Sequence, residues 1–311
     1  MFNHYSVLLK EVLEGLNIKQ DGIYVDATIG GAGHSSKICE HLSESGHLIG
    51  FDQDEVAIEA SRQKLSNSSP QFNLIHKNFS YLKDELEKLG IKKIDGILFD
   101  LGVSSVQLDT KDRGFSYRED ARLDMRMDTS SNLDAYQVIN TYPLEKLSKI
   151  FFVYGEEKYG NRIASKIVEV RKNKPIETTF ELVDIIKSCY PKKDLRDKHP
   201  AKKVFQAIRI EVNQELEVLK TALKDALDLL KVGGRCCVIT FHSLEDRIVK
   251  EIFNEASTVS WNKNQPFLLT DEKAKFKLIN KKPILPSDKE LEENNRSHSA
   301  KLRIIERVME G

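Results

Sequence analysis

The stretch Val25-Asp26-Ala27-Thr28-Ile29-Gly30-Gly31-Ala32-Gly33-His34-Ser35 decides the fold, because it joins an apolar run to a glycine-rich bend and a helix-compatible segment. This order predicts a strand, a tight turn and a helix. Glycines let the backbone turn with positive φ and approach a ligand closely, and the free N–H groups that open a helix attract anionic groups. We therefore expect a nucleotide-like ligand at this bend.

A second strand-like run, His47-Leu48-Ile49-Gly50-Phe51-Asp52, ends in an acid about twenty residues past the bend, where a carboxylate binds ribose hydroxyls in dinucleotide folds. The strict G-x-G-x-x-G pattern is only approximated, since Ser36 stands where the third glycine would be. The bend and Asp52 together indicate a cofactor that contains adenosine.

The composition narrows the class of protein. A length of 311 residues favours two domains, or one domain with a large insertion. Lys plus Arg and Asp plus Glu balance at 48 each, so any basic surface must be local. The 4 cysteines form no C-x-x-C pair, which predicts no metal and no disulfide framework and favours the reducing cytoplasm. No apolar run approaches the roughly 20 residues of a membrane span, so we expect no membrane association.

Apolar runs alternate with helical patterns in the first hundred residues, which predicts a doubly covered parallel sheet of the α/β, Rossmann-like class. The expected strands are 23–27, 47–52, 72–76 and 94–100. Ligands bind at the carboxyl ends of such strands. Those ends present polar or aromatic side chains at one rim, namely Asp26, Asp52, Asn78, Phe79 and Asp100.

The alternation stops after Asp100, and residues 108–205 predict an all-helical insertion between the two parts of the α/β domain, 1–107 and 206–311. Thr178 and Glu181 have the spacing of a capping box. A basic cluster near the end of the insertion is either a solvated loop or a phosphate-binding patch. Its members are Lys192, Lys193, Arg196, Lys198, Lys202 and Lys203.

Beyond the insertion the pattern predicts one long helix over 205–230, ended by Gly233 and Gly234, and then a strand over 235–241. Ser243-x-x-Asp246 predicts the cap of the next helix. His242 stands at the end of the strand, on the ligand rim, with no structural role of its own in this pattern. The loop-rich stretch 261–286 has room for one more strand in a hairpin, and a last strand is expected over 301–308, which makes seven strands in all.

Seven strands with the glycine bend after the first suit a nicotinamide enzyme or an S-adenosylmethionine methyltransferase. Asp26 favours the second, because a carboxylate near the loop repels a pyrophosphate but tolerates a cationic amino group. Methylation at carbon 5 of a pyrimidine needs a thiolate, and no cysteine lies in the loop after the fourth strand. Methylation of an exocyclic base amine needs a hydrogen-bond acceptor, which Asp100 can supply.

Several ordered motifs are typical of one family: Asp26-x-Thr28 with the glycine bend, Asp100-Leu101-Gly102-Val103-Ser104-Ser105-x-Gln107, Arg113-Gly114-Phe115-Ser116, Leu123-Asp124-Met125-Arg126-Met127-Asp128, Phe205-Gln206-Ala207-Ile208-Arg209, Thr240-Phe241-His242-Ser243-Leu244-Glu245-Asp246-Arg247 and Ser299-Ala300-Lys301-Leu302-Arg303. Over essentially the whole chain the sequence resembles the bacterial 16S ribosomal RNA cytosine-N4 methyltransferase family, RsmH or MraW.

The resemblance implies S-adenosylmethionine as cofactor, 16S ribosomal RNA of the small ribosomal subunit as substrate, and a helical domain inserted after the fourth strand. It places cofactor contacts on Ala32, Gly33, His34, Asp52, Phe79, Asp100 and Gln107. We expect Asp100 to be catalytic and His242, Ser243 and Arg303 to bind substrate, with a homodimer left open. The alternatives are a DNA or small-molecule N-methylase and a non-enzymatic ribosome-assembly module.

Overall fold

The computed structural model describes residues 6–104, 107, 110–195, 199–259 and 273–310. It divides into two compact units, which we call the sheet unit (Met1–Gly102 with Leu216–Gly311) and the helical unit (Val103–Glu215). Arg196 and Lys198 of the predicted basic cluster lie outside the described residues. Within the described ranges, no helix is long and apolar enough to cross a bilayer.

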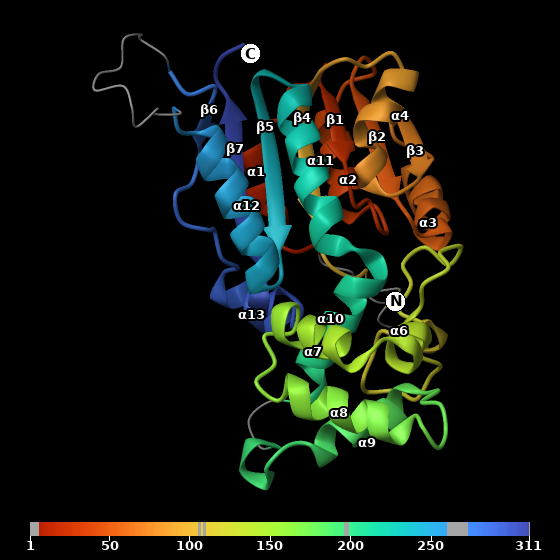
Figure 1. Ribbon diagram of the computed structural model, residues 1–311. Helices are drawn as coiled ribbons and strands as arrows, with labels where there is room; N and C mark the ends of the chain where they lie inside the picture. The colour runs from red at the N-terminus through yellow and green to blue at the C-terminus, as the bar shows by residue number, and fades with distance from the viewer. Residues whose placement is uncertain (1–5, 105–106, 108–109, 196–198, 260–272, 311) are drawn as a thin grey trace, which may run out of the picture. The chain divides into compact units, whose positions relative to one another are not determined.

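The sheet unit is built on a seven-stranded sheet of order β3-β2-β1-β4-β5-β7-β6 (Figure 1). The strands from β3 to β5 are parallel, and β7 runs antiparallel to both β5 and β6. The strands are β1 Ile23–Asp26, β2 His47–Asp52, β3 Gln71–His76, β4 Ile94–Asp100, β5 Leu230–Thr240, β6 Phe276–Leu278 and β7 Lys301–Arg307. This arrangement confirms the expected Rossmann-like α/β class.

Helices cover the sheet because its central strands are apolar on both faces; in β4 every residue from Ile94 to Phe99 is buried. The helices of the sheet unit are α1 Leu9–Leu16, α2 Gly33–His41, α3 Glu55–Leu65, α4 Leu82–Lys88, α11 Glu215–Leu229, α12 Ser243–Ala256 and α13 Asp288–Glu293. Residues of α1, α2 and several strands, β7 among them, pack into one hydrophobic core cluster. The cluster includes Leu8, Ile38 and Leu302.

The strand order reverses at β1, which pairs with β2 on one side and with β4 on the other. Open α/β sheets bind ligands outside the carboxyl ends of the strands at such a reversal. The last residues of β1 and β4 are Asp26 and Asp100. The topology therefore places two carboxyl groups at the expected ligand position.

The helical unit has its own hydrophobic core, which includes Phe151, Ile163, Leu182 and Ile208. Its helices are α6 Ala135–Thr141, α7 Leu144–Val153, α8 Gly160–Val170, α9 Thr179–Ser188 and α10 Ala201–Asn213. The capping box of α9 is confirmed: the Thr178 hydroxyl accepts from the Glu181 N–H, and the Glu181 carboxylate accepts from the Thr178 N–H.

The loop motifs of the helical unit are explained by its internal hydrogen bonds. The Arg113 guanidinium donates to the carbonyls of Arg126 and Met127, and the Arg113 carbonyl accepts from the Met125 N–H. Asn213 at the end of α10 donates to the Met125 carbonyl and accepts from the Met127 N–H. These motifs therefore hold two loops and a helix together.

The prediction of one long helix over 205–230 is wrong in two places. The helix breaks at Gln214, whose φ of 51° is left-handed, so that α10 and α11 are separate. The apolar periodicity continues across the break because both helices bury an apolar face. At the other end, Leu230 already pairs with Ile94, and Gly233 and Gly234 lie inside β5 rather than closing a helix.

Candidate active site

The glycine bend joins β1 to α2 with a left-handed backbone. Gly30 has a φ of 50° and Ala32 a φ of 54°, and Ala32 is the N-terminal cap residue of α2 without a side chain to cap it. A Cβ at Gly33 would overlap the Ser6 hydroxyl, so the loop at this position has room only for glycine unless Ser6 moves. The bend thus presents backbone, not side chains, at the start of α2.

Asp26 is buried and stabilises the bend through hydrogen bonds. Its carboxylate accepts a 2.6 Å hydrogen bond from the Ser35 hydroxyl and a 3.2 Å bond from the Thr28 N–H. Burial raises the pKa of Asp26, while the bond from Ser35 and the nearby His34 oppose that rise. Both carboxylate oxygens accept hydrogen bonds from within the protein. The main role of Asp26 is therefore to fix the conformation of the bend.

Asp52 links the end of β2 to the same bend. Its carboxylate accepts from the Gly30 N–H at 3.0 Å and from the Asp54 N–H at 2.9 Å. Burial raises its pKa to about 6 despite these two bonds. A carboxylate held in this way beside the bend is suited to accept hydrogen bonds from ribose hydroxyls.

Asp100 ends β4, and its backbone N–H donates to the Thr28 hydroxyl at 2.7 Å. One carboxyl oxygen, Oδ2, lies 3.6 Å from His34 Nδ1, and the other, Oδ1, is buried with no hydrogen-bond partner among the described residues. Burial, with a smaller contribution from Glu245, raises the pKa of Asp100 to about 7. Buried polar atoms normally have partners, so Oδ1 indicates a ligand that donates to it.

Phe79 follows β3, as the sequence predicts. Its ring meets Phe99 of β4 edge to face, with centroids 5.5 Å apart, and remains partly exposed. Asn78 caps the turn that carries Phe79 and donates to the Gln53 side chain next to Asp52. A fixed, partly exposed ring at this edge can pack against a flat purine.

Gln107 belongs to the helical unit. It is buried, and its side-chain oxygen accepts from the Ser104 N–H at 3.1 Å, while its own N–H donates to the Ser104 hydroxyl. Its contact with the cofactor remains a prediction.

The expected cap of α12 is wrong. The cap residue is His242, not Ser243: His242 Nδ1 accepts from the Glu245 N–H, and the Glu245 carboxylate accepts from the N–H groups of Phe241 and His242. The His-x-x-Glu spacing carries this capping box, whereas the more familiar Ser-x-x-Asp pattern directed the prediction one residue too far. Ser243 is the exposed first residue of the helix.

Arg303, the third expected substrate residue, is buried on β7 and pairs with Asp246 of α12, Nε to Oδ1 at 2.7 Å. The pair lowers the pKa of Asp246 against the opposing effect of burial. Arg303 therefore has a structural partner, and its contact with substrate remains a prediction, as do those of His242 and Ser243.

The residues at this rim fit S-adenosylmethionine. Asp52 can hold the ribose, Phe79 can pack on the adenine, and the charge of an ionised Asp100 favours the cationic cofactor. Carboxyl groups with raised pKa values at one rim favour a positively charged ligand, which relieves the cost of ionising them. The fold and the site together define an S-adenosylmethionine-dependent methyltransferase.

The chain belongs to the MraW methylase family, whose family model matches residues 1–308. The match covers almost the whole chain, so both units are part of the family's pattern. Membership confirms the resemblance given by the sequence motifs, and it agrees with S-adenosylmethionine as the cofactor.

Solved structures resemble the chain only distantly. A candidate rRNA-methylase from Clostridium thermocellum is 13% identical with a TM-score of 0.47, covering 98% of this chain and 100% of that one. An rRNA methylase from Streptococcus thermophilus is 12% identical (TM-score 0.42; 97% and 94%), and SMU.1697c from Streptococcus mutans, in complex with SAH, is 14% identical (TM-score 0.43; 99% and 100%). At these values the comparison has no bearing on the substrate.

Proposed function

We propose that this methyltransferase transfers a methyl group to N4 of one cytidine in 16S ribosomal RNA of the small ribosomal subunit, in the cytoplasm. The observation that carries the proposal is the Asp100 carboxyl, which ends β4 at the strand-order reversal with a buried, unpartnered oxygen. The cytosine-N4 assignment rests on this acceptor together with the family motifs of the sequence.

An exocyclic amine is a poor nucleophile until its lone pair is turned out of conjugation with the ring. A fixed acceptor that holds an N–H of the amine can impose that orientation. When ionised, Asp100 is such an acceptor, since its backbone N–H is fixed by the Thr28 hydroxyl and the carboxylate lies next to the His34 ring. S-adenosylmethionine bound at this rim supplies an activated methyl group.

A cysteine-based reaction at carbon 5 has no support from the thiols. All 4 cysteines are buried, and burial raises the pKa of Cys39 to about 11 and that of Cys237 to about 12, with that of Cys236 raised as well. The thiolate is the nucleophilic form, so the thiols of Cys39, Cys236 and Cys237 stay protonated and unreactive at neutral pH. Cys189 lies in the core of the helical unit.

The helical unit is proposed to bind the RNA. Its exposed lysines Lys192, Lys193 and Lys202, together with Lys203, can contact phosphates, although Lys203 also donates to the Glu156 carbonyl. Each phosphate contact adds to the salt dependence of binding. A splayed or single-stranded cytidine is the expected target, because extracting a stacked base costs a few kcal/mol.

The experiment is mass spectrometry of 16S RNA from cells that lack the gene. Loss of an N4-methyl mark on one cytidine, restored by the wild-type protein and not by an Asp100→Ala variant, is the expected result. Loss of a 5-methylcytidine mark, or of no mark, contradicts the proposal. Methyl incorporation into purified small subunits and into DNA separates the RNA enzyme from a DNA N-methylase.

A further inference from the structure

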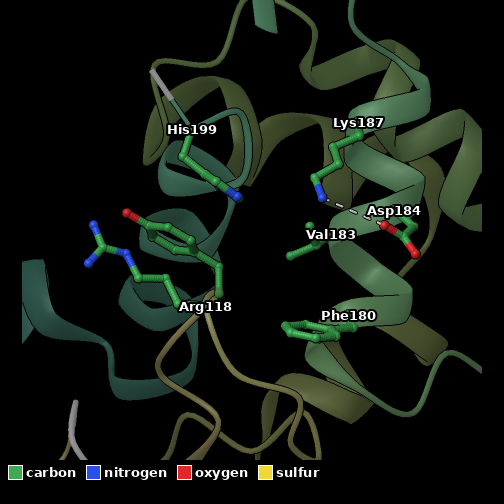
Figure 2. Close-up of a pocket in the computed structure, with 7 residues that line it drawn as sticks. Arg118, Phe180, Val183, Asp184, Lys187 and His199 are labelled. Atoms are coloured by element: carbon green, nitrogen blue, oxygen red, sulfur yellow. Dashed lines mark ion pairs between the residues drawn. The ribbon is translucent and has the colours of Figure 1, made fainter. Parts of the chain in front are cut away.

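The helical unit contains a pocket that none of the expected site residues lines. It has a volume of about 300 Å³, near the lower limit for small-molecule sites, which suits one flat group of the size of a nucleotide base. Its walls come from the loop at Tyr117 and Arg118, from α9 and from His199 (Figure 2).

One wall is a single face of α9. Phe180, Val183, Asp184 and Lys187 are spaced by three and four residues, so their side chains lie along one side of the helix. Val183 is buried and forms an apolar base, whereas the Phe180 ring is 44% exposed. A flat ligand that covers the Phe180 ring removes apolar surface from water, which is favourable in free energy.

The facing wall is aromatic and rigid. The Tyr117 ring stacks on His199 with centroids 4.4 Å apart and an angle of 20°, and the edge of Phe205 supports it from the core. Arg118 extends from the same loop with its guanidinium 6.0 Å from the centroid of the Tyr117 ring, and Figure 2 shows it across the pocket from α9. The stacked pair is therefore held in place before any ligand arrives.

Two cations, Arg118 and Lys187, stand on opposite sides of the pocket. Lys187 has Asp184 as a neighbour at 3.8 Å, a loose exposed pair that contributes little free energy and leaves the ammonium able to bind an anion. Burial and the positive charges of Lys187 and Arg118 lower the pKa of His199, so its ring is neutral at neutral pH and stacks as an aromatic.

We propose that this pocket is a second RNA subsite, which takes one unstacked nucleotide of a single-stranded segment, with its base against Phe180 and the Tyr117–His199 pair and its phosphates on Arg118 and Lys187. Aromatic surface combined with cations is the chemistry by which proteins hold single-stranded RNA. The inference rests on the proposed function and adds a positioning site built only from residues of the helical unit.

The experiment measures binding of a fluorescein-labelled, single-stranded oligoribonucleotide to the full chain by anisotropy, over a range of salt concentrations. Phe180→Ala is compared with Phe152→Ala, a matched control because Phe152 is exposed on α7 of the same unit. The double variant Arg118→Gln/Lys187→Gln is compared with Lys149→Gln/Lys172→Gln, which removes two exposed lysines outside the pocket.

We expect Phe180→Ala to weaken binding roughly fivefold or more, as loss of one base stack does. The pocket double variant should weaken binding and reduce the salt slope by about 1.4, at about 0.7 for each contact to a single strand. The control variants should bind like wild type. Affinity for S-adenosylmethionine, measured by calorimetry, and the thermal unfolding curve should both match wild type in every variant, which shows that both units are folded.

Equal binding by the pocket variants and their controls overturns the inference. So does a defect that appears only with assembled subunits and not with the free oligoribonucleotide, because that result indicates a protein segment as the occupant. If wild type methylates small-subunit RNA while the pocket variants keep its KM, the subsite alone is wrong. If wild type neither binds nor methylates RNA, the proposed function fails and the subsite with it.

Discussion

His34 Nδ1 lies 3.6 Å from Asp100 Oδ2, while Nε2 of the same ring lies 2.9 Å from the Val7 carbonyl. Because a carbonyl can only accept, Nε2 carries the proton of the neutral ring and Nδ1 is left as an acceptor. Burial lowers the pKa of His34 and raises that of Asp100 to about 7. Near neutral pH this pair therefore consists of a neutral imidazole and a carboxyl group that is partly protonated.

We predict that affinity for S-adenosylmethionine rises as pH increases from about 5.5 to 8, because the positively charged cofactor favours the ionised carboxyl groups. Asp52, with a pKa of about 6, contributes to the lower part of the rise and Asp100 to the part near pH 7. The charges of Asp26, His34 and Glu245 also affect the pKa values of Asp100 or its neighbours. A variant is therefore needed to assign the rise near pH 7 to Asp100. Calorimetry should show that Asp100→Asn removes the rise near pH 7, and an unchanged profile would contradict the assignment.

The same carboxyl group should oppose folding of the cofactor-free protein at high pH. Its pKa is about 7 when folded and about 3.9 when unfolded, so its contribution to stability is full below pH 4 and lost as pH rises through 7. Asp100→Asn should therefore raise the free energy of unfolding at pH 8, by about 1 to 2 kcal/mol for a side chain that is partly exposed, and leave it unchanged at pH 4. Thermal unfolding at the two pH values tests the difference.

Asp52→Ala should weaken S-adenosylmethionine binding by at least about tenfold, since charge-assisted hydrogen bonds contribute roughly 1.5 to 3 kcal/mol each. Part of the loss will come through the bend, because Gly30 loses its acceptor. Asp52→Asn keeps one acceptor oxygen and should bind with intermediate affinity. Glu55→Ala, at an exposed acid three residues on, is the control. An unchanged dissociation constant for Asp52→Ala would reject the ribose assignment.

His242 can be tested apart from its cap. His242→Ala should cost about 1 kcal/mol in unfolding free energy, whereas His242→Asn restores a good cap for α12. If the imidazole also binds substrate, both variants should raise the KM for RNA by a similar factor, in spite of their different stabilities. Recovery of the wild-type KM in His242→Asn would assign the residue to capping alone.

Gly114→Ala should destabilise the protein by about 2 kcal/mol or more. Gly114 has a φ of 68°, and a Cβ there would overlap the Arg122 carbonyl, which is backbone and cannot turn away. Gly90 has a similar φ of 73° but no atom within 4 Å of its Cβ position. Gly90→Ala therefore measures the backbone cost alone, about 1 to 2 kcal/mol. Equal losses for the two variants in chemical denaturation would contradict the steric explanation.

The sequence was sufficient for strands β1 to β4 and for the side chains at their carboxyl ends. Apolar strand runs have few alternatives, and Asp52 and Asp100 follow directly from where those runs end. The sequence was insufficient where one residue pattern is compatible with two different local conformations. Gln214 ends α10 with a left-handed backbone without breaking the apolar period, and His242 caps a helix although histidine is an uncommon cap. The pairing of Ser35 with Asp26 depends on the geometry of the turn, which spacing alone does not supply.

The pairing of β4 with β5 joins chain segments on either side of the helical unit. On the ribosome the first four strands emerge long before β5, so β4, whose apolar residues are destined for the centre of the sheet, remains an open edge during that interval. The helical unit has a core of its own, and all its residues are synthesised before β5. It can therefore complete its internal contacts before β5 emerges. Synthesis of the intervening residues therefore sets the minimum time for which the nascent chain exposes an unpaired strand, and with it the period in which aggregation competes with folding.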